Sequence, residues 1–114
     1  MYNQGDILLI PVPFTDLTST KKRPVLVISN DRYNRKTNDI LVAAITSNVT
    51  EKNYTVLISK LDLDVGDLKA DSCIRVDKIY SLSQGIVINT FGKAKSHIMN
   101  SVKEKLYQLI SDIE

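Results

Sequence analysis

The sequence contains one cysteine, Cys73, and one histidine, His97, and this scarcity excludes several kinds of site. One cysteine cannot close a disulfide within the chain, which is typical of proteins from a reducing compartment. One cysteine and one histidine are too few ligands for a common structural zinc site. A ribonuclease mechanism based on two histidines is excluded as well. We expect His97 to be a surface residue of a helix, because histidine is often partly exposed.

Glycine-rich phosphate loops and long apolar runs are also absent from the sequence. No motif of the Walker or dinucleotide-binding type is present. No apolar run approaches the ~20 residues that span a bilayer, and the N-terminus lacks the charged-then-apolar pattern of a signal peptide. We therefore expect a cytoplasmic protein that has no contact with a membrane.

Acidic residues gather in one stretch without the spacing of a metal site. Residues 61–77 contain Asp62, Asp64, Asp67, Asp71 and Asp77, against Lys69 and Arg75. This spacing does not match an EF-hand loop, and we interpret the stretch as a solvated acidic loop. We expect no metal and no other cofactor.

Positive charges gather in a different stretch. Residues 21–36 contain Lys21, Lys22, Arg23, Arg32, Arg35 and Lys36, against Asp31 alone. The formal net charge of +2 gives no evidence for a nucleic-acid partner. The separation of the two signs, however, would let one face of the protein attract a polyanion.

The length and composition fit a single globular domain over residues 1–114. The chain is 43% hydrophobic and 25% charged, which is ordinary for a soluble protein. A chain of 114 residues can form one hydrophobic core without the help of disulfides.

Short apolar segments predict a sheet of several strands. Residues 40–46 are apolar without alternation, so we expect a strand that is buried on both faces. Pro11 ends the first strand or places its end at a sheet edge. The segments predicted to be strands are 7–10, 23–29, 40–46, 54–59, 72–76, 79–82 and 86–91.

The last segment changes from a strand pattern to a helix pattern. Its apolar residues recur at spacings of three and four, which is the stripe of an amphipathic helix that begins near Lys95–Ser96. These residues are Ile98, Met99, Val102, Leu106, Leu109, Ile110 and Ile113. Short strands followed by one helix favour a mainly β protein, a small curved antiparallel barrel with a C-terminal helix packed against it.

The stretch 21–29, Lys-Lys-Arg-Pro-Val-Leu-Val-Ile-Ser, combines cations with a strand. Proline is tolerated at the start of a strand, so Pro24 fits a strand that Arg23 leads. Lys21 and Lys22 are then expected on the loop before it, and Arg23 at its mouth. A cation on a rigid element suits a phosphate site. The alternative is a solvated charge run beside a core strand.

Two further groups of polar residues are candidates for function. Thr46, Ser47 and Asn48 follow the buried strand 40–45, and Asp71-Ser72 precedes the strand 72–76. Each has a structural alternative. A threonine at a strand end often bonds local backbone, and Asp71-Ser72 fits a turn with its own side-chain bonds.

These segments together form an ordered pattern along the chain. Gly5-Asp6 precedes an apolar strand, residues 22–28 read Lys-Arg-Pro-Val-Leu-Val-Ile, and residues 42–46 read Val-Ala-Ala-Ile-Thr. Asp71-Ser72, Asp77-Lys78-Ile79 and the helix 99–106 follow in order. With this set, which covers nearly the whole chain, the sequence resembles the MazF/PemK toxin endoribonucleases of bacterial toxin–antitoxin modules.

The resemblance implies an SH3-like barrel, a homodimer and metal-independent, sequence-selective cleavage of single-stranded RNA. The expected products carry 2′,3′-cyclic phosphate and 5′-hydroxyl ends. It also implies a cognate antitoxin, an acidic and partly disordered peptide laid over the basic face, and contact with operator DNA only through the toxin–antitoxin complex.

The same resemblance assigns roles to residues. Arg23 matches the catalytic arginine of the family and Thr46 its catalytic threonine. The residues expected to bind substrate are Lys21, Lys22, Ser47, Asn48, Asp16 and Asp77. Tyr54 is either a stacking partner for a base or a core residue.

The chemistry of the residues agrees with this assignment except for the base. A fixed guanidinium donates two hydrogen bonds to phosphate oxygens, and Thr46 can bond the same phosphate. Arginine has a pKa above ~12, which makes it a poor general base. Familiar members carry a Gly-Ser-Glu-Gln segment before the arginine, whereas residues 16–21 here read Asp-Leu-Thr-Ser-Thr-Lys. Asp16 or no residue would fill the role of that glutamate.

Two other functions stay open for a chain of this kind. The same barrel family includes gyrase poisons, in which the C-terminal helix would carry the function. A plain SH3-like binding module without activity is the third reading, because function depends on the site and not on the barrel.

Overall fold

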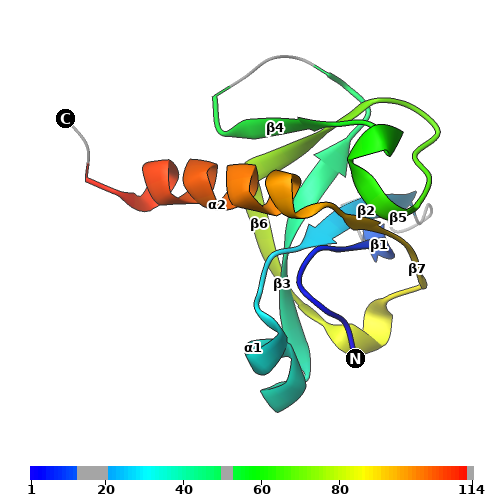
Figure 1. Cartoon of the computed structure of the whole chain (residues 1–114). Coiled ribbons are helices and arrows are strands. Elements are labelled where there is room, and N and C mark those ends of the chain that lie inside the picture. Colours follow the sequence, from blue (N-terminus) through cyan, green and yellow to red (C-terminus); the bar gives the residue numbers. More distant parts are fainter. Residues whose placement is uncertain (13–20, 50–52, 113–114) are drawn as a thin grey trace.

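The structure is a computed structural model that describes residues 1–12, 21–49 and 53–112 (Figure 1). Its strands are β1 (Asp6–Val12), β2 (Lys21–Val27), β3 (Asp39–Thr46), β4 (Thr55–Ile58), β5 (Leu63–Gly66), β6 (Ser72–Ser83) and β7 (Asn89–Ala94). Its helices are α1 (Asp31–Lys36) and α2 (Ser96–Ile110), with the 3₁₀ turns η1 (Lys60–Asp62) and η2 (Gln84–Ile86).

The strands form one antiparallel sheet in the order β4-β6-β3-β2-β1-β7-β5. The sheet curls into a half-barrel, and α2 lies beside β4 and packs against β4 and β6 (Figure 1). The predicted class, a mainly β antiparallel barrel with a C-terminal helix, is therefore confirmed.

Two hydrophobic clusters explain why the central strands do not alternate. One cluster joins the inner face of the sheet to α2 and includes Leu26, Ala43, Ile74 and Val102. The other covers the opposite face of the central strands, and its buried members are Leu8, Ile10, Val25, Val27, Ile40 and Val42. Strands β1, β2 and β3 are thus buried on both sides, as predicted for residues 40–46.

Strand β2 begins two residues earlier than the sequence predicted. Lys21 and Lys22 belong to the strand, where they pair with Val12 and Pro11 of β1, so their expected place on a loop is wrong. Pro24 lies inside the strand, opposite Leu9 of β1. The pairing of β2 with β3 starts only at Val25. Within the described residues, β2 therefore pairs with one strand only at Pro24. Proline is tolerated at such an edge position, because it has no N–H to donate to a second strand.

Three other expectations were also wrong in detail. The acidic stretch 61–77 is not all loop, since its first part contains the end of η1 and all of β5, and Leu63 is buried in the inner cluster. The segments 72–76 and 79–82 are parts of one strand, β6. The last predicted strand, 86–91, is shifted along the chain to β7.

Only the first half of the predicted apolar stripe of α2 is buried. Ile98, Met99 and Val102 lie in the inner cluster, whereas Leu109 is 37% exposed and Ile110 is 74% exposed. The second half of α2 projects beyond the sheet (Figure 1). Ile113 lies outside the described residues. Among the helices described, none has the length and apolar character needed to cross a membrane.

A carboxylate joins η1 to the start of α2. The Ser59 backbone N–H donates to Asp62 Oδ2 at 2.8 Å, and the Ser59 hydroxyl donates to the same oxygen at 3.2 Å. His97 Nε2 lies 2.9 Å from Asp62 Oδ1. The backbone bond from Ser59, followed by His97, lowers the pKa of Asp62 below its usual 3.8. His97 is therefore an exposed helix residue with a structural partner, as predicted.

We predict that Asp62→Asn destabilises the protein at neutral pH but not in acid. The pKa of Asp62 is lower in the folded chain than in the unfolded one, so its stabilisation is present above about pH 4 and lost as the pH falls through the folded pKa. Urea unfolding should show a loss of about 1 kcal/mol at pH 7 that shrinks toward zero below about pH 3. Asp64→Asn, at an exposed neighbouring carboxylate, is the control, and an equal loss there would contradict the prediction.

Candidate functional site

The register of the sheet places Arg23 and Thr46 on the same face. Val25 of β2 pairs with Ala44 of β3. Because residues two apart in a strand share a face, Arg23 lies on the face of Val25, and Thr46 on the face of Ala44. This is the outer face of the sheet, opposite the face that packs on α2.

Both residues line one cavity of about 550 Å³, which we call the cationic cavity. Three cations and two hydroxyl-bearing side chains stand around an apolar surface, an arrangement that accepts an anion attached to an apolar ring. The residues that line it are Ile10, Pro11, Arg23, Val25, Ala44, Ile45, Thr46, Arg75, Lys78, Tyr80, Leu82 and Ile86.

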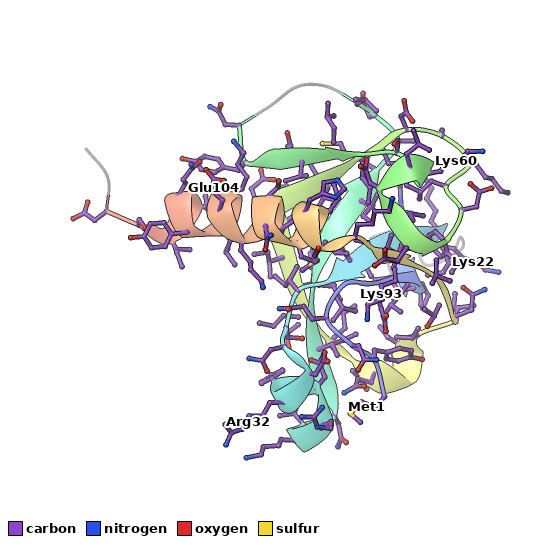
Figure 2. The ribbon with its side chains drawn as sticks, viewed as in Figure 1. Met1, Lys22, Arg32, Lys60, Lys93 and Glu104 are labelled. Atoms are coloured by element: carbon purple, nitrogen blue, oxygen red, sulfur yellow. The ribbon has the colours of Figure 1, made fainter. Side chains whose placement is uncertain are left out.

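Strand β2 positions Arg23. The residue is exposed, pairs with Ile10 of β1, and is followed by Pro24 and the fully buried Leu26. Lys21 shares the face of Arg23, and Lys22 points to the other face. Neither lysine lines the cationic cavity, and both are exposed (Figure 2 labels Lys22).

Thr46 ends β3 and bonds to the chain that follows it. The Asn48 backbone N–H donates to Thr46 Oγ1 at 3.1 Å, so the turn that the sequence allowed as an alternative is present. A threonine hydroxyl can accept and donate at once, so the bond from Asn48 leaves its own hydrogen able to donate to a ligand. Ser47 and Asn48 are exposed and do not line the cavity.

A break in the register brings Arg75 and Lys78 into the cavity. The pairing of β3 with β6 passes from Ala43–Ile79 to Ala44–Arg75, so residues 76–78 form a bulge in β6. Bulges re-aim side chains, and they are common beside functional sites. The Val76 backbone N–H donates to the carbonyl of Tyr54 at 3.0 Å, which ties the bulge to the residue before β4.

Asp77 does not line the cavity but holds Arg75. Arg75 Nε donates to Asp77 Oδ1 at 2.9 Å, and Nη2 donates to Oδ2 at 2.8 Å. The hydrogen bond from Arg75 holds the pKa of Asp77 below its usual value, and Asp77 in turn raises the pKa of Arg75. Asp77 is thus paired within its own strand.

Sequence reasoning missed Arg75, Lys78 and Tyr80 as neighbours of Arg23. The alternation in 72–76 puts Arg75 on the face opposite Ile74, which was the available signal. The bulge that follows it has no sequence signature, so the positions of Lys78 and Tyr80 could not be read from periodicity.

The remaining candidates lie elsewhere. Asp16 falls outside the described residues. Ser72 is buried and its hydroxyl donates to the carbonyl of Ala70 at 3.1 Å, which is the turn alternative for Asp71-Ser72. Tyr54 is half-buried and does not line the cationic cavity. In the part of the chain that the structure describes, no group of three His, Cys, Asp or Glu side chains could hold a metal ion.

Sequence comparison identifies a family over nearly the whole chain. Residues 3–110 match the family described as PemK-like, MazF-like toxin of type II toxin–antitoxin systems. Among curated proteins, none matches the sequence.

Solved structures with the same fold carry related descriptions. A MazE–MazF complex from Deinococcus radiodurans matches with a TM-score of 0.80 at 18% identity, over 98% of this chain and 97% of that one. An endoribonuclease bound to its cognate antitoxin from a mycobacterial species matches with a TM-score of 0.78 at 16% identity, over 100% and 99%. The Mycobacterium tuberculosis toxin MazF-mt6 matches with 0.73 at 17%, over 90% and 93%. At these identities the likeness establishes the fold.

Proposed function

We propose a function from one established premise: the chain belongs to the PemK-like, MazF-like toxin family of type II toxin–antitoxin systems. The proposed function is metal-independent, sequence-selective cleavage of single-stranded RNA in the cytoplasm. The observation that carries it is that Arg23 and Thr46 line the same cavity from neighbouring strands. Similar folds described as endoribonucleases support it.

The proposed reaction uses the RNA as its own nucleophile. The 2′-hydroxyl loses its proton and its oxygen attacks the adjacent phosphorus, the bond from phosphorus to the 5′-oxygen breaks, and the 5′-oxygen gains a proton, so that no proton is consumed overall. The products are a 2′,3′-cyclic phosphate and a 5′-hydroxyl. Arg23 donates two hydrogen bonds to the phosphorane oxygens, and Thr46 donates a third. Such fixed donors stabilise the transition state by about 3 kcal/mol each.

The acceptor of the 2′-hydroxyl proton is a separate part of the proposal. The side chains that line the described cavity are cations, a phenol, a threonine and apolar groups, with no carboxylate among them. Asp77 is committed to Arg75. Asp16, from the segment before β2, is the sequence candidate for this role.

Self-association and antitoxin binding complete the proposal. Tyr80, Ile86 and Ile88 are between 40% and 49% exposed, and Tyr80 and Ile86 line the cationic cavity. An apolar surface of this kind suits a homodimer. Relatives are seen with antitoxins, and we propose a cognate antitoxin whose acidic segment covers the cations here. Operator DNA would be bound only by that complex.

The first test removes the two proposed catalytic groups. We expect Arg23→Ala and Thr46→Val each to slow cleavage by about 10² to 10³-fold, because each removes a donor to the phosphorane. Cleavage of a fluorescent RNA gives the rates, and thermal unfolding shows whether the variants fold. Arg32→Ala is the control, since Arg32 lies on α1 and does not line the cationic cavity. Figure 2 shows it far from Lys22, the neighbour of Arg23 in β2. Unchanged rates in both variants would refute the site.

The second test concerns metal and products. Cleavage is expected to be unaffected by excess EDTA, and polynucleotide kinase should label the new 5′ ends without prior dephosphorylation. Sequencing those ends from a mixed RNA pool gives the recognition sequence. Loss of cleavage in EDTA, or 5′-phosphate ends, would contradict the mechanism.

A second candidate is a gyrase-binding protein without hydrolytic activity, which the exposed second half of α2 favours because Ile110 is 74% exposed. A sample that traps gyrase on DNA and leaves RNA intact would support it. A protein that does neither would be the inactive SH3-like binding module.

A further inference from the structure

The cationic cavity contains a second guanidinium, and it is fixed more firmly than a surface arginine usually is. Arg75 and Arg23 both line the cavity, together with Lys78. Both bonds of Arg75 to Asp77 are shorter than 3.0 Å and together form a bidentate pair. The bond therefore sets the plane of the guanidinium before any ligand arrives.

The geometry of the pair leaves a binding edge. A guanidinium is planar and has two edges that can each donate a pair of parallel hydrogen bonds. Asp77 accepts from Nε and Nη2, which form one edge. The other edge, formed by Nη1 and the outer hydrogen of Nη2, is directed away from the carboxylate and fits a phosphate.

The sheet sets the spacing between the two arginines. β3 lies between β2 and β6, and Val25, Ala44 and Arg75 are aligned across these three strands. Two strand spacings separate the backbones of β2 and β6 by about 10 Å. Arg23 lies two residues further along its strand than Val25. This separation lets the two guanidiniums reach two neighbouring phosphates of one RNA strand.

We propose that Arg75 binds the phosphate next to the one that is cleaved, and that Asp77 is a positioning residue for Arg75. The inference rests on the proposed function and deepens it. An anion is the expected ligand because Arg23 and Lys78 share the cavity and raise its positive potential.

A ligand can reach the pair. The side chains of Arg75 and Asp77 are 25% and 32% exposed, so neither is sealed in the core. The pair also places a negative charge beside a cavity proposed to bind RNA. The carboxylate by itself would lower the affinity for RNA. Orienting Arg75 is a role that would offset this loss.

Replacing Asp77 tests its positioning role, because the two possible roles of the carboxylate change the affinity for RNA in opposite directions. If the carboxylate only repels RNA, Asp77→Asn tightens binding. If it positions Arg75, Asp77→Asn raises KM by about three- to tenfold although a negative charge has been removed. Arg75→Gln should raise KM by about tenfold with kcat changed less than threefold, and Arg75→Lys should not restore it, because lysine has no fork. In an Arg75→Gln background, Asp77→Asn should have no further effect.

Controls separate these effects from net charge and from folding. Arg32→Gln and Asp64→Asn change the charge equally on exposed residues outside the cavity (Figure 2 labels Arg32). Thermal unfolding should be similar in all variants. A tighter-binding Asp77→Asn protein would overturn the positioning role, and an unchanged KM in Arg75→Gln would overturn the inference while wild-type cleavage keeps the proposed function intact.

The ligand is identified with modified RNA built on the mapped recognition sequence. A methylphosphonate, which has no charge, replaces in turn each linkage beside the cleaved one. At one position it should raise the KM of the wild type about tenfold and leave Arg75→Gln unaffected. Equal sensitivity of both proteins at every position, or a dependence of Arg75 on a base and not on a linkage, would overturn the phosphate assignment.

Binding without cleavage tests the inference independently of catalysis. An RNA with 2′-O-methyl groups cannot supply the nucleophile, and fluorescence anisotropy gives its affinity at several salt concentrations. Loss of one phosphate contact in Arg75→Gln should lower the slope of log K against log salt by about 0.7. If the wild type binds but never cleaves RNA, the proposed function fails, and this slope still decides the role of Arg75. No binding by the wild type overturns both.

Discussion

The pairing of Val25 with Ala44 is the constraint on which the site depends. Side chains in a strand alternate between faces, so a slip of one residue would send Arg23 or Thr46 to the side of α2. The slip is prevented by packing, because consecutive residues such as Val25 and Leu26 of β2, or Val42 and Ala43 of β3, fill clusters on opposite faces. Two hydrophobic clusters therefore fix the face of the sheet on which Arg23 and Thr46 lie, although neither residue belongs to a cluster.

This arrangement explains the roles of the residues around the site. Pro24 is tolerated because β2 has one described neighbour there, and that same lack of a second neighbour leaves Arg23 exposed. Thr46 lies where β3 ends, and its hydroxyl accepts a hydrogen bond from the Asn48 backbone N–H. Rigid strands thus deliver both groups at their ends, where a ligand can reach them.

The sequence was sufficient for the parts that packing determines. Unalternating runs such as 40–46 predicted strands buried on both faces, and the three-and-four spacing predicted α2. The exposed end of α2 could not be foreseen. The apolar residues Leu109 and Ile110 show that this face of the helix is apolar, but they do not show whether the sheet extends far enough to cover it. The place of Lys78 in the cavity depends on a bulge, and a bulge leaves no period in the sequence.

That bulge has a consequence for how such a site can change. Residues 76–78 interrupt the pairing of β6 with β3, and only Val76 among them belongs to a core cluster. Substitutions at Asp77 and Lys78 are therefore free of the packing that holds Val25 and Leu26. Relatives at 16–20% identity keep this fold with TM-scores of 0.70 to 0.80, which shows how few side chains the barrel requires. Arg23 and Thr46, on the fixed strands β2 and β3, can therefore keep the proposed chemistry. Substitutions at Asp77 and Lys78, on the bulge, can change which ligand the cavity binds.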